Sequence, residues 1–245
     1  MPTKKSPRSL LRKTLNLLHL DVTRNLAYDR LTRSIMRKVI GRDTNCIDIG
    51  CHKGEMLDLI LALAPDGTHY AFEPIPDMYD ELLARYNGRT RVLPFALADF
   101  NGESEFQYIR NDPAYSGLKK RSYDIKDPDI EVIRVEVKRL DDIIEANHRV
   151  GFIKIDVEGG EFGVLKGSRE LIIRDKPVII FECGLGASDF YDTDPGALFR
   201  FFSEETGHQV SFLKSYVKGN GSLTEEAFVS VFRSNAEWYF VAHPA

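Results

Sequence analysis

Cysteine is scarce in this chain, with three residues among 245, at positions 46, 51 and 183. Because their number is odd and their spacing fits no zinc pattern, a disulfide scaffold is disfavoured and reduced thiols in a cytoplasmic protein are expected. Long hydrophobic runs are also missing, since no apolar stretch approaches the roughly 20 residues that a membrane span needs. The N-terminus has basic residues but no continuous apolar segment, so we expect neither a secretory signal nor a transmembrane helix.

The glycine pattern of dinucleotide-binding enzymes, Gly-x-Gly-x-x-Gly, is lacking as well. The apolar run Cys46–Ile49, interrupted by Asp48, predicts a buried strand, Gly50 and Gly54 bracket a turn, and a helical pattern follows from Glu55. Strand, glycine turn and helix form the nucleotide crevice of open α/β sheets. The carboxylate within Asp-x-Gly-x-x-x-Gly suits a cationic amino group, as in S-adenosylmethionine, better than a pyrophosphate.

Charge is unevenly distributed along the chain. Residues 1–42 hold eleven Lys and Arg against two Asp, a net charge of +9, whereas residues 43–245 hold 22 basic and 35 acidic residues, a net charge of −13. Leucines at helical spacing predict a basic helical extension, 1–42, before one α/β domain, 43–245. The extension packs against the domain or a second subunit in one interpretation, and contacts an anionic membrane or a nucleic acid in the other.

Acidic residues recur at the ends of the predicted strands. Further strands are expected at 68–73, 91–99, 151–157 and 177–183, and the carboxyl edge of a parallel sheet is where open α/β folds bind ligands. Glu73 has the spacing of the acid that binds a ribose, and Asp99 could accept the adenine amino group. The acidic residues at this predicted edge are Asp48, Glu73, Asp99, Asp156, Glu158 and Glu182.

Two alternating segments, 103–110 and 130–140, predict a β-hairpin insertion. Between them lies a polar segment, 111–129, which predicts a long mobile loop near the pocket. We expect this loop and residues 185–195 to shape the acceptor pocket, with substrate contacts from Tyr115, Ser116, Glu182 and Tyr191. The C-terminal part predicts a helix over 195–206 and strands over 209–216 and 237–242.

With these segments in view, the chain resembles the FkbM family of S-adenosylmethionine-dependent methyltransferases from about Asn45 to Cys183. The most characteristic match is Lys154–Gly159, which reads Lys-Ile-Asp-Val-Glu-Gly and is followed by Glu161. Where many members have Ala-Asn, the first turn carries Cys51-His52, and Gly160 replaces a common alanine. The other matching segments are Ile47–Gly50 with Gly54, Phe72–Pro74, Ala96–Asp99 with Gly102, Leu140–Asp142 and Val164–Gly167.

The resemblance implies a class-I methyltransferase fold: a Rossmann-like, mostly parallel seven-stranded sheet with helices on both faces and an antiparallel last strand. It implies methyl transfer to an oxygen, often a hydroxyl of a sugar, glycan or natural product. For the cofactor, it implies that Asp48, Gly50 and Gly54 surround the methionine part. Glu73 and Pro74 would then bind the ribose, and Ala98 and Asp99 would lie near the adenine.

A methyl transferase of this kind must remove a proton from its acceptor. We expect Asp156 or Glu158, held beside Lys154, to be the general base, with His52 as a second candidate because its ordinary pKa lies near neutrality. In an alternative, Asp156, Glu158 and Glu182 hold Mg²⁺, which would polarise the acceptor hydroxyl.

Other classes of protein remain open from the sequence. One is a catalytically inactive cofactor-binding scaffold acting through the basic extension, and another is a dinucleotide-dependent oxidoreductase, which the missing third glycine disfavours. Nucleic acid is not an expected partner, because the acidic domain repels phosphate and no Asn/Asp-Pro-Pro-aromatic motif is present. Homo-oligomers through the N-terminal helices are the other association we consider.

Overall fold

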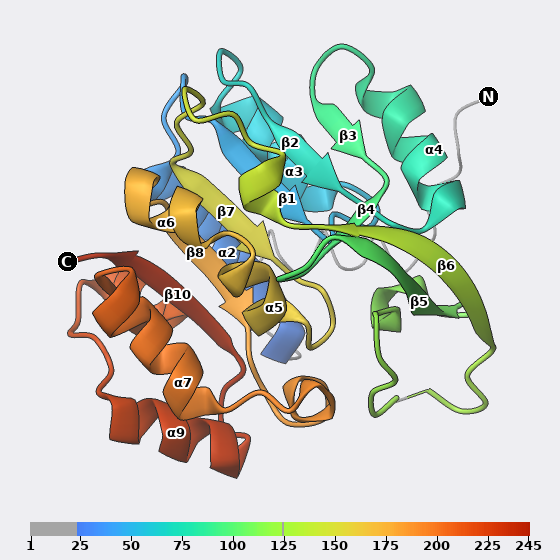
Figure 1. Ribbon diagram of the computed structural model, residues 1–245. Coiled ribbons are helices and arrows are strands. Elements are labelled where there is room, and N and C mark those ends of the chain that lie inside the picture. Colours follow the sequence, from blue (N-terminus) through green and yellow to red (C-terminus); the bar gives the residue numbers. More distant parts are fainter. Residues whose placement is uncertain (1–23, 124) are drawn as a thin grey trace.

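A seven-stranded sheet forms the centre of the molecule in the computed structural model, which describes residues 24–123 and 125–245 (Figure 1). The strand order is β3-β2-β1-β7-β8-β10-β9, and β10 is antiparallel to both of its neighbours, whereas the other pairs are parallel. The predicted class-I methyltransferase architecture is therefore confirmed. The strands are β1 (Cys46–Ile49), β2 (Tyr70–Phe72), β3 (Arg91–Leu93), β7 (Phe152–Ile155), β8 (Val178–Glu182), β9 (His208–Phe212) and β10 (Tyr239–Pro244).

Helices cover both faces of this sheet, which is why β1 and β7 are buried along their whole length. On one face lie α2 (Arg24–Val39), α3 (Glu55–Leu63), α4 (Pro76–Tyr86) and α8 (Leu213–Lys218). On the other lie α5 (Glu161–Lys166), α6 (Arg169–Asp175), α7 (Pro195–Arg200), the π-helical turn η4 (Phe201–Glu205) and α9 (Glu225–Ser234).

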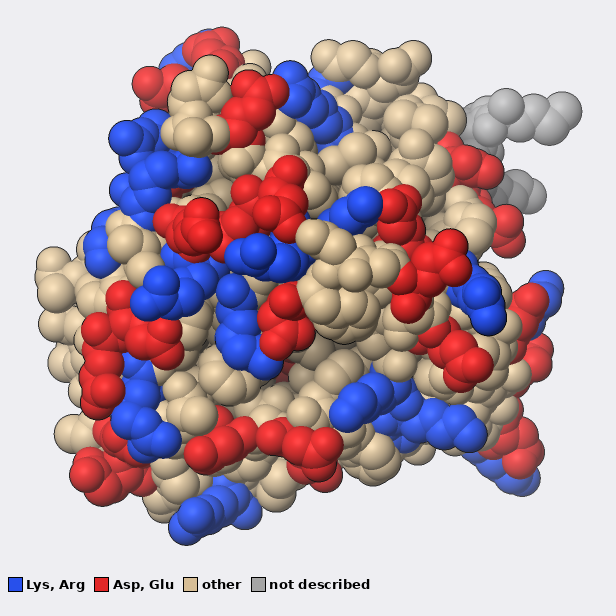
Figure 2. Space-filling view, in the orientation of Figure 1, with Lys and Arg blue, Asp and Glu red and all other residues tan. Residues whose placement is uncertain are grey.

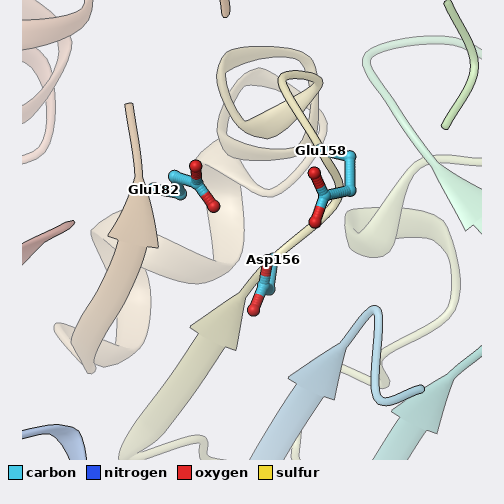
Figure 3. Close-up of side chains that lie close together, drawn as sticks. All are labelled: Asp156, Glu158 and Glu182. Atoms are coloured by element: carbon cyan, nitrogen blue, oxygen red, sulfur yellow. The ribbon is translucent and has the colours of Figure 1, made fainter. Parts of the chain in front are cut away.

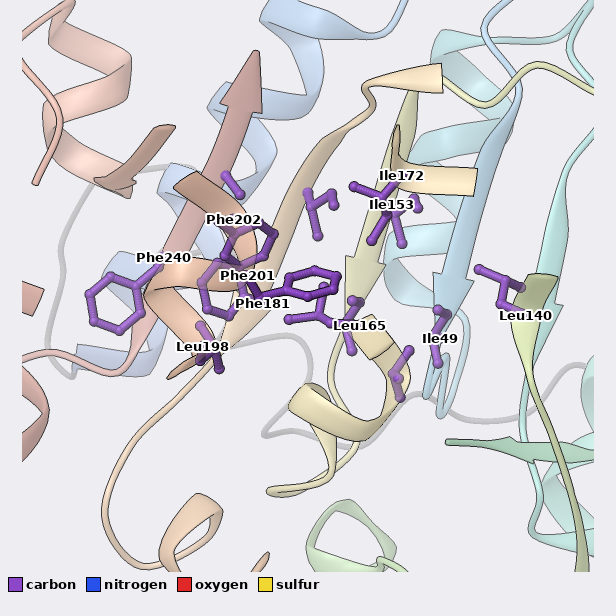
Figure 4. Close-up of a cluster of buried hydrophobic side chains, with 14 of the residues drawn as sticks. Ile49, Leu140, Ile153, Leu165, Ile172, Phe181, Leu198, Phe201, Phe202 and Phe240 are labelled. Atoms are coloured by element: carbon purple, nitrogen blue, oxygen red, sulfur yellow. The ribbon is translucent and has the colours of Figure 1, made fainter. Parts of the chain in front are cut away.

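The largest hydrophobic cluster lies between the sheet and the second group of helices (Figure 4). Its centre is aromatic: the Phe181 ring lies 5.0 Å from that of Phe202 and 5.8 Å from that of Phe240, measured between ring centroids. Aromatic side chains bury large apolar areas, so this cluster fixes α7 and η4 on β8 and β10. The carboxyl ends of the strands beside it are thereby held in place.

A second sheet of three strands, β4 (Phe95–Leu97), β6 (Ile130–Lys138) and β5 (Gly102–Ile109), contains the predicted hairpin insertion. The predicted strand at 91–99 is split into β3 and β4 at Pro94, because proline lacks the N–H that a continuous ladder needs. This break directs the chain from the main sheet into the second sheet. Short 3₁₀ turns lie at η1 (Pro113–Tyr115), η2 (Leu140–Asp142) and η3 (Ser188–Tyr191).

Several element boundaries differ from the sequence-based expectation. The helix expected from Glu161 is divided into α5 and α6 around Gly167, where a Cβ would collide with the carbonyl oxygen of Ala98. The strand expected over 209–216 ends at Phe212 and continues as α8, since a short apolar run does not distinguish strand from helix. The helix α9 was not predicted, and the helix expected over 195–206 ends in the π-helical turn.

The described part of the basic extension is the helix α2, which buries Leu26, Ile35 and Met36 among other side chains. Ile35 and Met36 belong to the hydrophobic cluster that also contains Phe152 of β7. Residues 1–23 of the predicted extension lie outside the described residues. Within 24–123 and 125–245, no helix has the length and apolar character needed to cross a membrane.

Candidate active site

A cavity of about 150 Å³ opens at the carboxyl ends of β1, β2 and β7. Gly50, Glu73 and Asp156 line it from the edge of the main sheet, and residues of the insertion, including Phe106 and Ser116, close the opposite wall. The cavity therefore lies where the sequence predicted the ligand.

The turn after β1 brings three strand ends together. Gly50 has φ +73°, and a Cβ at this position would collide with the carbonyl oxygen of Asp156. The amides of Gly50 and Cys51 both donate to the carbonyl oxygen of Phe72, at 3.0 and 3.2 Å. Glycine is therefore required at position 50 both by its left-handed conformation and by the close approach of the β7 end.

Glu73, at the end of β2, is buried beneath the cavity. Its Oε2 accepts from the amide of His52 at 2.9 Å, and its Oε1 accepts from the amide of Ile75 at 3.1 Å. Burial raises the pKa of Glu73 to about 7, although the two backbone donors oppose the shift. These bonds fix the carboxylate and leave each oxygen a lone pair for a ligand in the cavity.

Asp156 follows β7 and lines the cavity. Lys154 donates to its Oδ2 at 2.8 Å, and the hydroxyl of Tyr239 donates to the same oxygen at 3.0 Å. Burial would raise the pKa of Asp156, but the Lys154 ammonium and these two hydrogen bonds outweigh it and lower the pKa. Asp156 is therefore ionised at neutral pH.

Two further carboxylates lie beside Asp156, as Figure 3 shows. Carboxylate oxygens of Asp156, Glu158 and Glu182 lie within 4.8 Å of one another. Burial, followed by the charges of Asp156 and Glu161, raises the pKa of Glu182 to about 8. Arg121 of the insertion forms an ion pair with Glu158, so the cations next to this cluster are protein side chains.

His52 lies on the turn between β1 and α3 and lines the cavity in a left-handed conformation, with φ +48°. Its Nε2 is buried and has no hydrogen-bond partner among the described residues. Burial, and to a smaller extent the nearby charge of Lys53, lowers the pKa of His52. The imidazole is therefore neutral at physiological pH. Glu158 has a left-handed backbone too, with φ +59°, and strain of this kind gathers at functional sites.

Seven of the sequence-predicted residues do not line the cavity: Asp48, Gly54, Ala98, Asp99, Tyr115, Lys154 and Glu182. Asp48 and Lys154 lie below it, in register on β1 and β7, and burial raises the pKa of Asp48 to about 6. Gly54 accommodates Tyr86, whose hydroxyl would lie 2.5 Å from a Cβ there. Ala98 and Asp99 belong to the segment after β4, and Asp99 forms an ion pair with Lys166 of α5. The residues from the predicted set that line the cavity are Gly50, His52, Glu73, Pro74, Ser116, Asp156, Glu158 and Tyr191.

The insertion loop, the described part of segment 111–129, forms hydrogen bonds that hold it beside the cavity. Gly117 pairs with Gln107 of β5, and the amide of Lys119 donates to the hydroxyl oxygen of Tyr191 at 2.9 Å. The Tyr191 ring also covers the backbone of Gly159, where a Cβ would lie 2.9 Å from the ring. Tyr115 does not line the cavity but lies under the Arg121 guanidinium, 5.2 Å from its ring centroid. The loop between the hairpin strands is thus hydrogen-bonded both to β5 and to Tyr191.

Three residues of this arrangement were not among the predicted site residues. Glu161 is buried, and its Oε1 accepts from the amides of Val157 and Gly159, so it shapes the turn that carries Glu158. Its position directly after the Lys154–Gly159 segment was the available signal. Arg121 and Tyr239 reach the cluster from distant parts of the chain, so the spacing of near neighbours could not place them beside it.

The sequence around this cavity matches a known protein family. The profile of the methyltransferase FkbM domain matches residues 48–214, which span β1 to α8 and contain the cavity. The chain belongs to the FkbM methyltransferase family. This confirms the resemblance drawn from the Lys154–Gly159 segment.

One solved structure of the same family is similar in fold. The FkbM methyltransferase from Methylobacillus flagellatus matches with a TM-score of 0.50 at 16% identity, over 83% of this chain and 44% of that one. This FkbM domain thus spans less than half the length of that relative. A putative rRNA methylase from Clostridium thermocellum has a TM-score of 0.46 at 9% identity, over 86% of this chain and 93% of that one. No curated protein is a significant match.

S-adenosylmethionine is the cofactor of this methyltransferase family, and the cavity of this FkbM domain fits it. The buried Glu73 carboxylate is fixed by two amides and retains lone pairs of the kind that accept from ribose hydroxyls, and Gly50 lines the same cavity. Ile75 and Phe95 contribute apolar side chains to the cavity lining, as a site for an aromatic base requires.

Proposed function

We propose that this FkbM domain transfers a methyl group from S-adenosylmethionine to a hydroxyl oxygen of a sugar, glycan or natural product. The observation that carries this proposal is the position of Asp156, ionised and fixed in the same cavity as Glu73, the proposed ribose ligand. An enzyme acting on a hydroxyl needs a proton acceptor at this point. A domain that only bound the cofactor would have no use for it.

The chemistry expected of the chain is simple. S-adenosylmethionine, when bound, supplies a methyl group that is already activated on a sulfonium. Asp156 would accept the proton of the acceptor hydroxyl as the oxygen becomes a nucleophile, a contribution of about 10²–10⁴-fold in rate. The wall formed by Tyr191 and the insertion loop would align the acceptor, and positioning supplies roughly 7–11 kcal/mol in well-oriented systems.

Glu158, His52 and Lys154 have other parts in this proposal. Glu158 is bound to Arg121, and its oxygens would contact the acceptor rather than take its proton. His52, with a neutral imidazole and an unpaired Nε2 among the described residues, would form a hydrogen bond to the cofactor or acceptor. Lys154 would hold Asp156 in its ionised form from below the cavity.

The acceptor class follows from the shape and charge of the site. A partly enclosed cavity at the strand ends suits a small molecule or the end of a glycan. Lys and Arg are interleaved with Asp and Glu over the face drawn in Figure 2, a mixed pattern unlike the basic stripe that binds a phosphate backbone. We therefore propose a small or glycan acceptor in preference to a nucleic acid.

Mg²⁺ has no place in the proposed mechanism. Asp156 and Glu158 already have cationic partners, Lys154 and Arg121, which neutralise the cluster from two sides. We expect methyl transfer to proceed at an unchanged rate in the presence of a chelator. A rate that falls with chelator and returns with added Mg²⁺ would contradict this.

The cofactor part of the proposal is tested first by calorimetric titration with S-adenosylhomocysteine, with NAD as the control ligand. We expect micromolar binding of the first and none of the second. If neither ligand binds, the domain is a scaffold without a working cofactor site and the proposal fails.

The catalytic part is tested with Asp156→Asn. We expect kcat to fall by about 10²–10⁴-fold, with the Kd for S-adenosylhomocysteine within a few-fold of wild type, because the change removes the proton acceptor and keeps the shape. Asp99→Asn is the matched control, since Asp99 lies outside the cavity lining, and it should retain kcat. A large loss of cofactor binding in Asp156→Asn would place Asp156 in the cofactor shell instead.

A further inference from the structure

The Asp156 carboxylate is held by one of its two oxygens. Lys154 Nζ and the Tyr239 hydroxyl both donate to Oδ2, at 2.8 and 3.0 Å. No described residue donates a hydrogen bond to Oδ1. The backbone of Asp156 is fixed as well, because its amide donates to the carbonyl oxygen of Ile49 at 3.0 Å and its own carbonyl oxygen packs against Gly50.

Tyr239 comes from a part of the chain far from the family motif. It begins β10, the antiparallel strand, and pairs in register with Glu182 at the end of β8. It lies outside the residues 48–214 that match the FkbM domain. Its ring packs 5.1 Å from that of Tyr28 on α2, between centroids, and its hydroxyl donates to Asp156.

We propose that Tyr239 is a positioning residue for Asp156: with Lys154 it occupies Oδ2, so that Oδ1 is the oxygen presented to the acceptor hydroxyl. This inference rests on the proposed function and assigns a role to the carboxyl-terminal strand. Two donors from different strands also remove the rotation of the carboxylate about its Cβ–Cγ bond. A carboxylate fixed in this way is already oriented to accept the proton, so no conformational entropy is lost in orienting it during the reaction.

The proposed role of Tyr239 can be measured through the pKa of Asp156. Two hydrogen bonds and the Lys154 ammonium stabilise the ionised carboxylate against burial and against the neighbouring acids. Loss of the Tyr239 hydroxyl should therefore shift the Asp156 titration to higher pH. The titratable groups that face Asp156 are Lys154 from β7, Tyr239 from β10, Asp48 from β1, His52 from the first turn, Glu158 from its own loop, Glu161 from α5 and Glu182 from β8.

The test is Tyr239→Phe, with Tyr28→Phe as the matched control. Both variants lose a hydroxyl from the same pair of packed rings, but the Tyr28 hydroxyl bonds Glu237 and not Asp156. In Tyr239→Phe we expect kcat to fall about tenfold, which corresponds to about 1.4 kcal/mol, with the acceptor KM and the Kd for S-adenosylhomocysteine unchanged. The acid limb of the kcat profile and the Asp156 titration followed by ¹³C NMR should both move to higher pH.

A second variant guards against a folding defect in the first. Incorporation of 3-fluorotyrosine at position 239 keeps the ring and makes its hydroxyl a stronger donor. With this residue the acid limb and the Asp156 titration should move to lower pH, opposite to the effect of Tyr239→Phe.

The outcomes separate this inference from the proposed function. An active wild-type enzyme whose Tyr239 variants titrate and turn over like Tyr28→Phe would overturn the role of Tyr239 alone. A wild-type protein that binds S-adenosylhomocysteine and transfers no methyl group to any hydroxyl would overturn the proposed function, and the inference with it.

Discussion

At the scale of single residues, the site contains backbone conformations and buried charges that would destabilise the protein without particular neighbours. Gly50 and Gly88 have nearly the same left-handed backbone, with φ +73° and +74°, but only Gly50 has a strand end against it. Similarly, Glu73 is an acid that stays in a buried position because two amides bind it. The chemistry of the site therefore depends on neighbours that the residue type alone does not reveal.

The pair of glycines gives a direct test. We expect Gly88→Ala to cost only the conformational penalty of a left-handed alanine, about 1–2 kcal/mol, because no atom of the described residues lies within 4 Å of the added Cβ. Gly50→Ala adds a collision with the Asp156 carbonyl and should cost about 1–3 kcal/mol more. Urea unfolding of both variants measures the difference. Equal losses would mean that the approach of Asp156 to Gly50 is not tight.

Glu73 predicts a pH dependence of cofactor binding. Because the pKa of Glu73 in the folded protein is raised to about 7, raising the pH through that value ionises the carboxylate and makes it a better acceptor for the ribose hydroxyls. The Kd for S-adenosylhomocysteine should therefore fall as the pH rises from about 6 to about 8. Glu73→Gln should bind more weakly, with a flatter dependence on pH. A wild-type Kd independent of pH would contradict the prediction.

The raised pKa of Glu73 also makes folding stability depend on pH. A rise in pH that favours cofactor binding lowers the stability of the folded protein. A carboxyl whose pKa is 4.5 when unfolded and about 7 when folded keeps its proton longer in the folded state. Its contribution to stability is therefore lost as the pH rises through this interval. The melting temperature of Glu73→Gln relative to wild type should increase over the same interval in differential scanning calorimetry, and a constant difference would exclude a raised pKa.

At the scale of elements, the insertion loop shows how local sequence misleads. The polar segment 111–129 reads as a mobile loop, but the structure ties its described residues to β5, to Tyr191 and to Glu158. Each of these partners is distant in sequence or belongs to another element. The hairpin strands themselves were predictable, because alternation is a property of adjacent residues.

The hydroxyl of Tyr191 anchors this loop. We expect Tyr191→Phe to lose about 1 kcal/mol of loop stabilisation, since the amide of Lys119 loses its acceptor. Hydrogen exchange of residues 117–123 should become faster and the acceptor KM should rise several-fold, with cofactor binding unchanged. Tyr108→Phe, on the neighbouring strand β5, serves as the control and should change neither value. A KM unaffected by Tyr191→Phe would mean that the loop does not shape the acceptor site.

At the scale of the whole molecule, the helix α2 joins the N-terminal basic region to the core. Arg24 stacks on Trp238, and Tyr28 contacts both Trp238 and Tyr239, so α2 packs on the strand that supports Asp156. Met36 is fully buried in the cluster under β7. The net charge of +9 over residues 1–42 thus includes a helix whose apolar side belongs to the fold.

Substitution of Met36 tests this integration. We expect Met36→Ala to destabilise the protein by about 2–5 kcal/mol, which lowers the melting temperature by roughly 4–20 °C. Arg37→Ala, at the exposed neighbouring position, should stay within about 0.5 kcal/mol of wild type. Thermal unfolding followed by circular dichroism distinguishes the two. A small effect of Met36→Ala would mean that α2 contributes little to the core.

The sequence by itself determined the sheet, the glycine turn, the hairpin insertion and the acids at the strand ends. These follow from spacing between near neighbours, which is why Glu73 and Asp156 were predictable as cavity residues. Only the tertiary structure decided that Asp99 pairs with Lys166 away from the cavity and that Arg121 and Tyr239 reach the acidic cluster. Those contacts join residues as much as 83 positions apart, and a side chain's partners across such a distance depend on how the elements pack.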